Sequence, residues 1–200
     1  MKKQVSLIIL LIIASFSYAQ KMKVQEGNIK NLKDINQYSL VFDYSDLEIP
    51  KFKNEAEFLK DKMEKREKKE AGSGEEFKKN WFNDREERYQ PKFIESFNKR
   101  FKNNEITVTD NDTSNYIMHI HTTKIYPGYN VGIMRHNAEI SVTISVYSKA
   151  NPDEILFKGS YKDVQGAGAM GYDYNSGYRI SECYAKSAKI FAKYIQKKAL

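Results

Sequence analysis

A short run of glycines has the spacing of a nucleotide-binding loop. Gly166, Gly168 and Gly171 form G-x-G-x-x-G, which lets backbone amides approach the pyrophosphate of a dinucleotide. The full motif also needs its third glycine at the start of a helix, followed by a second parallel strand and an acidic residue. Here residues 172–177 separate the glycines from the final helix, and no further strand follows. The pattern therefore predicts a strand-to-helix loop, and we expect no cofactor.

A second pattern, His119-x-His121, has the spacing of two metal ligands on one strand. Alternate residues of a strand point to the same side, and Glu139 would lie opposite His121 if the following hairpin closes near Tyr129–Val131. Zinc accepts such a set, so a small metal-dependent enzyme is the alternative function. The leading interpretation treats the two histidines as ordinary residues on a solvated face, with no metal.

No catalytic nucleophile is evident. The single cysteine, Cys183, shares a predicted helix with Ile180 and Tyr184, which favours a buried thiol that packs as a small apolar group. The serines lack the G-x-S-x-G elbow of hydrolases. We therefore assign no catalytic residue and expect a protein that is not an enzyme.

Apolar and polar residues alternate in the segments that must position these side chains. The clearest strand is Arg135–Ser148, where the even positions from Ala138 to Val146 are apolar and the odd ones polar. Further strands are predicted at Tyr38–Ser45, Tyr116–Ile125 and Glu154–Val164. This alternation is typical of an antiparallel sheet with one covered face. We expect an α+β fold whose mainly antiparallel sheet of four to five strands has helices packed on one face.

Helical spacing appears in three segments. Helices are predicted from about Asn54, from about Glu75, and over Tyr178–Lys198. The second helix has aromatic residues at multiples of four, and Pro91 should kink or restart it because proline lacks the amide that an interior turn needs. The aromatic row comprises Phe77, Trp81, Tyr89, Phe93, Phe97 and Phe101.

The first residues form a secretory signal. Lys2 and Lys3 precede an apolar run, and Ser17 and Ala19 supply the small residues that signal peptidase requires. We expect cleavage after residue 19, one domain over residues 20–200, and a soluble exported protein in the periplasm or outside the cell. The only cysteine lies near the other end, so no lipid anchor is expected, and no later stretch is long enough to span a membrane.

The distribution of charge excludes one class of partner. The formal net charge is +7, and Lys2 and Lys3 contribute two of these charges, which leaves +5. Acids and bases alternate in the run Lys53–Glu70, as on a solvated helix face. Nucleic-acid binding rewards clustered basic residues, so we expect no nucleic-acid partner.

Two predicted loops are unusually apolar and rich in tyrosine. A hairpin connection is normally polar, and tyrosine gives a large contact area at a low entropic cost. These loops either fold over the sheet end as a lid on the core or contact a protein or glycan partner. The candidate contact residues are Tyr126, Tyr129, Val131, Ile133 and Met134 in the first loop and Tyr172 and Tyr174 in the second.

The second half of the chain resembles a known group of domains. SNYIMHIHTTKIYPG, AEISVTISVYS and the last helix together look like the periplasmic α/β domains of Gram-negative bacteria typified by the curli-secretion lipoprotein and the penicillin-binding-protein activators. The resemblance covers Asn115–Lys198 and implies contact with envelope machinery without catalysis. The chain departs from that group by lacking the lipid-acceptor cysteine. We therefore expect an exported interaction or assembly module of the envelope or secreted fraction.

Overall fold

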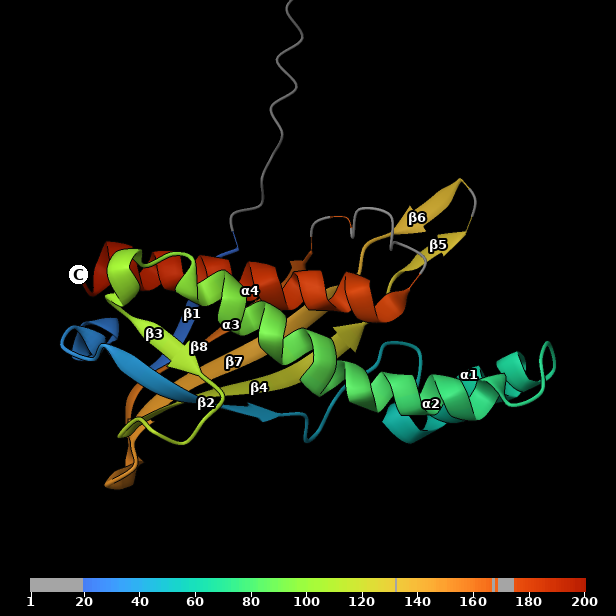
Figure 1. Cartoon of the computed structure of the whole chain (residues 1–200), viewed down its shortest axis with the longest axis horizontal. Helices are drawn as coiled ribbons and strands as arrows, with labels where there is room; N and C mark the ends of the chain where they lie inside the picture. The colour runs from blue at the N-terminus through green and yellow to red at the C-terminus, as the bar shows by residue number, and fades with distance from the viewer. Residues whose placement is uncertain (1–19, 132, 167, 169–174) are drawn as a thin grey trace, which may run out of the picture.

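A six-stranded sheet forms the centre of the protein in the computed structural model, which describes residues 20–131, 133–166, 168 and 175–200 (Figure 1). The predicted signal peptide, residues 1–19, lies outside the described residues. The strand order is β1-β8-β7-β4-β2-β3. The strands are β1 (Lys23–Gly27), β2 (Gln37–Asp43), β3 (Thr107–Thr109), β4 (Tyr116–Tyr126), β7 (Glu139–Ser148) and β8 (Asn151–Gln165).

The α+β class is confirmed, but the sheet is larger and more mixed than predicted. β4, β7, β8 and β1 pair antiparallel, whereas β2 is parallel to both of its neighbours, β3 and β4. The parallel pairing follows from the helical segment between β2 and β3, because a helical crossover brings the chain back in the same direction. β1 was not predicted because all five of its residues are exposed and show no alternation. β3 was not predicted because it has only three residues.

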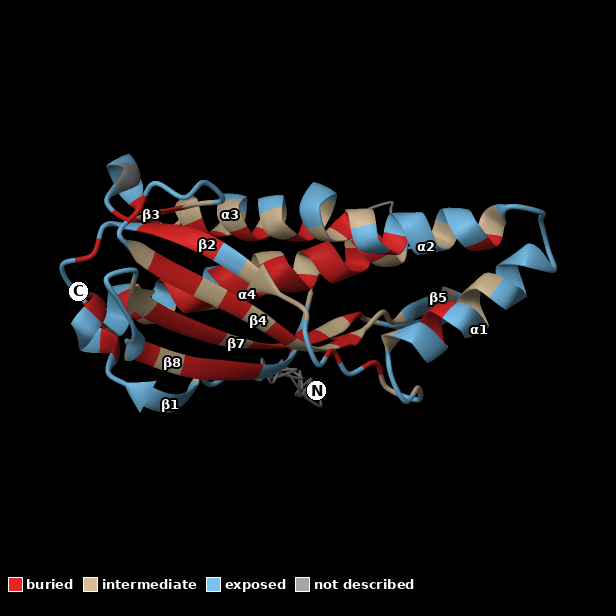
Figure 2. Cartoon of the chain, turned by 90° about the horizontal axis from the view of Figure 1, so that it is seen from below, coloured by how far each residue is buried: buried red, intermediate tan, exposed pale blue. Residues whose placement is uncertain are grey.

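One face of the sheet is covered by helices (Figure 2). Short 3₁₀ turns occur at η1 (Ile29–Leu32) and η3 (Lys102–Asn104). α3 and α4 pack together along this face, and α4 contacts β7 and β8. The longer helices are α1 (Glu55–Glu67), α2 (Ser73–Asp84), α3 (Gln90–Asn98) and α4 (Ser176–Lys198).

A π-helical turn, η2 (Arg85–Tyr89), joins α2 to α3 in one long rod. Pro91 follows it as the second residue of α3, and proline has no amide to donate to the preceding turn. The predicted interruption near Pro91 is therefore present as a turn with i→i+5 hydrogen bonding, which is rare and usually one turn long. Tyr89, the last residue of this turn, is buried and stacks on Tyr184 of α4, with ring centroids 5.1 Å apart.

Aromatic rings dominate the core between the sheet and the helices. Phe191 of α4 lies 5.8 Å from Phe157 of β8 and 6.4 Å from Phe97 of α3, measured between ring centroids. All three side chains are fully buried. The row spaced by four residues on the long rod therefore packs inward at Tyr89, Phe93 and Phe97, as predicted for a helix that covers the sheet.

Two extensions project from the same end of the sheet (Figure 1). The first, here called the arm, is the helical hairpin of α1 and α2, residues 55–84. The second, here called the ribbon, consists of β5 (Tyr129–Val131) and β6 (Met134–His136), which pair antiparallel. The arm and the ribbon form the walls of the candidate site.

Candidate functional site

The ribbon continues the β4–β7 hairpin beyond the sheet. Tyr126 pairs with Glu139, Tyr129 with His136, and Val131 with Met134. The segment Tyr126–Met134, predicted as a loop, is thus mostly strand. Its turn lies between Val131 and Met134, further along the chain than predicted.

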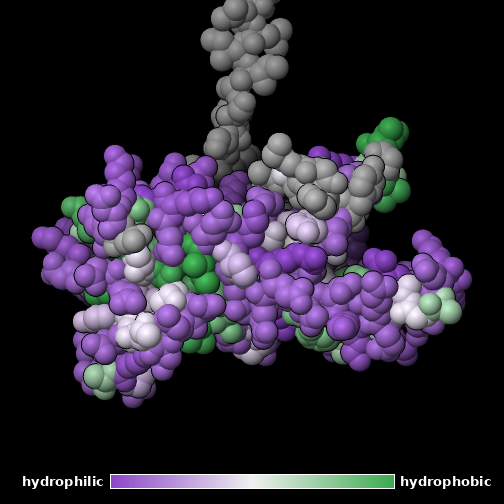
Figure 3. Space-filling view, viewed as in Figure 1, coloured by the Kyte–Doolittle hydropathy of each residue, from purple (hydrophilic) through white to green (hydrophobic). Residues whose placement is uncertain are grey.

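The apolar side chains of the ribbon point into solvent. The exposed fractions are 62% for Val131, 103% for Ile133 and 60% for Met134. Figure 3 shows green, hydrophobic surface at the outer end of the ribbon, at the upper right. Tyr129 is also exposed, whereas Tyr126, at the base, is half-buried. The alternative in which this segment forms a lid on the core is therefore wrong for the tip residues.

The second predicted contact segment is only partly described. Tyr172 and Tyr174 lie outside the described residues. The structure describes the chain again from Asn175 onward. The side-chain oxygen of Asn175 accepts a hydrogen bond from the backbone amide of Gly177 at 2.8 Å and so caps α4. The second predicted segment therefore leads directly into the end of α4 that faces the arm and the ribbon.

Arg179 attaches the ribbon to the body of the protein. Its side chain is only 8% exposed. The guanidinium donates to the carbonyl oxygen of Pro127 through Nε at 3.1 Å and through Nη2 at 3.0 Å, and to that of Gly128 at 3.3 Å. Gly128 has a φ of 65°, a conformation that glycine adopts most easily. α4 thus holds the base of the ribbon beside the arm.

A cleft of about 340 Å³, here called the arm–ribbon cleft, opens between the arm and the ribbon base. Residues 49–52, which follow β2, line it together with residues of the arm, the ribbon base and the start of α4. Aromatic and basic side chains predominate. The lining comprises Ile49, Pro50, Lys51, Phe52, Phe58, Lys62, Arg66, Phe77, Tyr126, Pro127, Gly128, Tyr129, Ser176 and Arg179.

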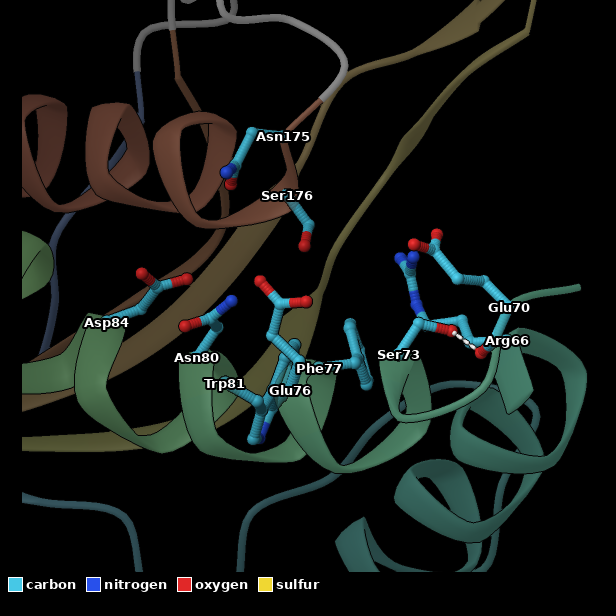
Figure 4. A pocket seen from close by; sticks show the side chains of 10 residues that line it. All are labelled: Arg66, Glu70, Ser73, Glu76, Phe77, Asn80, Trp81, Asp84, Asn175 and Ser176. Atoms are coloured by element: carbon cyan, nitrogen blue, oxygen red, sulfur yellow. Dashed lines mark hydrogen bonds between the residues drawn. The ribbon is translucent and has the colours of Figure 1, made fainter.

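A second pocket, of about 440 Å³, adjoins this cleft and shares Arg66, Phe77 and Ser176 with it. Figure 4 shows Glu76, Asn80 and Asp84 along α2, facing the start of α4. Asp84 is buried and forms an ion pair with Arg88. This pocket is polar and partly acidic, in contrast to the arm–ribbon cleft.

The two histidines of the predicted metal set lie together on the sheet face opposite the helices. Their ring centroids are 6.4 Å apart. Asp43 of β2 lies between them, with its Oδ2 3.6 Å from Nε2 of His119 and 3.9 Å from Nε2 of His121. His121 Nε2 is also 2.8 Å from the carbonyl oxygen of Ser45.

Glu139 does not join these histidines, and that part of the prediction is wrong. The register pairs His121 with Thr143 and places Glu139 opposite Tyr126, because the hairpin turns later than predicted and a bulge lies between Thr122 and Lys124. The Glu139 carboxylate instead accepts a hydrogen bond from Gln165 at 2.7 Å. Within the described part of the chain, no three His, Cys, Asp or Glu side chains are grouped so that they could hold a metal ion.

Burial lowers the pKa of His119. Desolvation is the main cause; Asp43 opposes it, and His121 and Lys158 add to it. The pKa of Asp43 is also lowered; desolvation opposes that shift, while hydrogen bonds from Ser45 and the charges of both histidines produce it. The cluster thus favours a neutral imidazole at position 119 beside an ionised carboxylate.

A pH dependence of stability follows from His119. The pKa of His119 is lower in the folded state than in the unfolded chain. As the pH falls below about 6.5, the histidine is therefore protonated in the unfolded chain before it is protonated in the folded protein, and the free energy of unfolding decreases. Between pH 7.5 and 5 the unfolding free energy of the wild type should therefore fall more steeply than that of His119→Gln. Asp43 adds nothing there, since its contribution is lost only below about pH 4. Urea unfolding at several pH values tests this.

The same urea series on His136→Gln, whose side chain lies on the exposed ribbon, controls for the loss of an imidazole in general. Equal slopes for the wild type and His119→Gln would contradict the assignment.

Cys183 belongs to the core, and Gly166, the first glycine of the loop pattern, packs against it. The Cys183 side chain is fully buried, as predicted, and its thiol lies 3.1 Å from the carbonyl oxygen of Ala138. Burial raises the pKa of this thiol to about 12. The amide of Gly166 donates to the sulfur at 3.2 Å. This glycine therefore serves close packing of β8 against α4.

The arm–ribbon cleft is the feature that sequence reasoning missed. Its lining comes from five separate stretches of the chain, and only the excess of apolar residues at Tyr129 and its neighbours gave a local signal. Comparison with protein-family models, with curated proteins and with solved structures finds no match for this chain.

Proposed function

We propose that the protein is a non-enzymatic interaction module that binds a partner through the tip of the ribbon. The observation that carries this proposal is the full exposure of Ile133 between the largely exposed Val131 and Met134. Water disfavours such apolar area, and contiguous exposed apolar residues are typical of binding sites. A ribbon that projects beyond the sheet presents them to a groove of another molecule.

The tip supplies part of the affinity. Burial of each large apolar side chain contributes about 1.5–3 kcal/mol before the entropic cost of association is subtracted. A standard interface buries about 800 Å² on each partner, which is more than the tip alone provides. A second contact surface is therefore needed, and the adjacent arm–ribbon cleft and the segment with Tyr172 and Tyr174 are the candidates.

The proposed compartment is the periplasm or the extracellular medium. Lys2 and Lys3, the apolar run after them, and Ser17 and Ala19 support export. Among the described residues, none of the helices combines the length and apolarity needed to cross a bilayer. We also propose that the protein belongs to the group of envelope domains that it resembles. The strand pattern in the second half of the chain supports this part of the proposal.

The ribbon tip can be tested by combining two substitutions with photo-crosslinking. A photo-crosslinking side chain at position 131 should capture one defined partner in the native cells. Adding Tyr129→Ser and Ile133→Ser should reduce this capture at least about tenfold, because a tenfold loss needs only about 1.4 kcal/mol. The unfolding free energy should change by less than about 0.5 kcal/mol, as for exposed positions in general.

Lys197, on the exposed last turn of α4, provides a control position for the crosslinker. Capture of the same molecule from position 197, or a large fall in stability with unchanged capture, would refute the ribbon as the contact surface. Capture of a second copy of the chain would identify the partner as the protein itself.

A further inference from the structure

The arm–ribbon cleft has a one-sided charge. Lys51, Lys62 and Arg66 line it on the side of the arm and the segment before it, and among the residues that the structure describes no acidic side chain lines it. The sequence of α1 does not reveal this charge, because acidic and basic residues alternate along the helix. Asp61 of the same helix, for example, pairs with Lys65 at 2.7 Å. The fold thus separates basic side chains from the mixed run and turns them toward a concave surface.

Aromatic rings hold two of these cations in place. Lys62 Nζ lies 5.6 Å from the ring centroids of both Phe52 and Phe58, and the Arg66 guanidinium lies 4.5 Å from that of Phe77. A ring face attracts a cation without neutralising it. Among the described residues, Lys62 forms an ion pair with Asp61 at 3.5 Å. The cations therefore remain able to pair with an incoming carboxylate.

The uncharged lining of the cleft is poor in hydrogen-bonding side chains. It includes the rings of Phe58 and Phe77 on the arm and of Phe52 before it, and its described neutral polar side chains are Ser176, Tyr126 and Tyr129. A sugar has a hydroxyl on nearly every carbon, and each one buried without a partner costs free energy. Apolar rings beside cations fit an acidic group flanked by an apolar side chain better.

The ribbon adds a strand edge next to the cleft. β5 pairs with β6, and in the described part of the chain these two strands form a sheet by themselves. Tyr129 of β5 lines the cleft, while no residue of β6 does, so β5 is the strand on the side of the arm. A free strand edge can pair with an extended peptide.

We propose that the arm–ribbon cleft binds a short acidic segment of the partner protein in an extended conformation. A carboxylate of that segment pairs with Lys62 and Arg66, and a neighbouring apolar side chain packs on Phe52 and Phe77. The cleft volume of about 340 Å³ lies at the lower end of ligand sites and suits a few side chains. This inference rests on the proposed function and supplies its second contact surface.

The test uses three fluorescent pentapeptides in anisotropy titrations with the purified protein. The first is Glu-Phe-Glu-Val-Glu, the second has glutamine at each acidic position, and the third has lysine there. The acidic peptide should bind at least about tenfold more tightly than the other two. Its affinity should fall with increasing salt, because screening weakens exposed ion pairs.

Two double variants locate the site. Lys62→Gln with Arg66→Gln should weaken binding of the acidic peptide at least about tenfold, which corresponds to about 1.4 kcal/mol. Lys197→Gln with Lys198→Gln changes the net charge equally at the far end of α4 and should alter it less than about twofold, since screened charges at that distance contribute little. Lys51→Gln is the second variant if the first pair fails to fold.

Several outcomes would overturn the proposal. These are equal binding of the glutamine peptide, equal weakening by both double variants, or tighter binding of trigalacturonate than of the acidic peptide, which would point to an acidic glycan. Crosslinking from position 131 is an independent measurement. If it persists while the acidic peptide fails to bind, the ribbon tip stands and only the cleft assignment falls.

Discussion

Replacing Phe191 by alanine is expected to lower the free energy of unfolding by about 3–5 kcal/mol. The side chain is fully buried and joins Phe157 of β8 to Phe97 of α3. Its loss removes the transfer free energy of the ring and leaves a cavity that three elements line, so collapse is limited. Urea unfolding measures the change.

Ile133→Ala is the matched control for this experiment. It also removes a large apolar side chain, but one that is fully exposed, so the unfolding free energy should change by less than about 0.5 kcal/mol. A cost for Phe191→Ala below about 1 kcal/mol would mean that the helices do not form one core with the sheet.

Replacing Gly166 by alanine should lower the free energy of unfolding by about 1–3 kcal/mol, as expected for overpacking. A Cβ at this position would lie 2.8 Å from the backbone nitrogen of Cys183 and from the carbonyl carbon and Cβ of Glu182. Most of these are backbone atoms of α4, so the helix itself must shift. The cost should rise further for Gly166→Val. Thermal or urea unfolding of the series measures it.

Gly72 provides the contrasting series. Its φ is 84°, and a Cβ there would meet no atom within 4 Å. Alanine and serine at position 72 should therefore cost a similar amount, about 1 kcal/mol, because the cost is conformational and not steric. If Gly166→Val is no worse than Gly166→Ala, close packing is not the role of this glycine.

The elements with strong periodicity could be predicted from the sequence. In β7 the side chains of Ile140, Val142, Ile144 and Val146 are buried, as their alternation indicates. The opposite face was described less well: Ser141 and Ser145, predicted to meet water, are only 9% and 8% exposed. Short polar side chains between larger neighbours on adjacent strands lose contact with solvent, and alternation within one strand does not reveal this.

Long-range arrangement limited the prediction of the site. The ribbon tip was found because apolar residues at a hairpin turn violate a local rule. The position of Glu139 was wrong because a hairpin register depends on where the turn lies, and a bulge shifts it again. Apart from the apolar excess around Tyr129, the arm–ribbon cleft had no local signal, since its lining residues come together only after the arm and the ribbon are placed at the same end of the sheet.

The π-helical turn sets the direction in which the arm faces. Residues spaced by four drift about 40° around an α-helix at each step, because one turn takes 3.6 residues. Over the length of α2, η2 and α3 this drift would carry Phe77 and Trp81 well away from the side on which Phe93 and Phe97 meet the sheet. The wider turn at Arg85–Tyr89 takes up one extra residue and cancels part of the rotation. The single inserted residue thus changes the side of the rod on which the aromatic residues lie. One continuous rod can therefore pack on the sheet core at one end and line the cleft at the other.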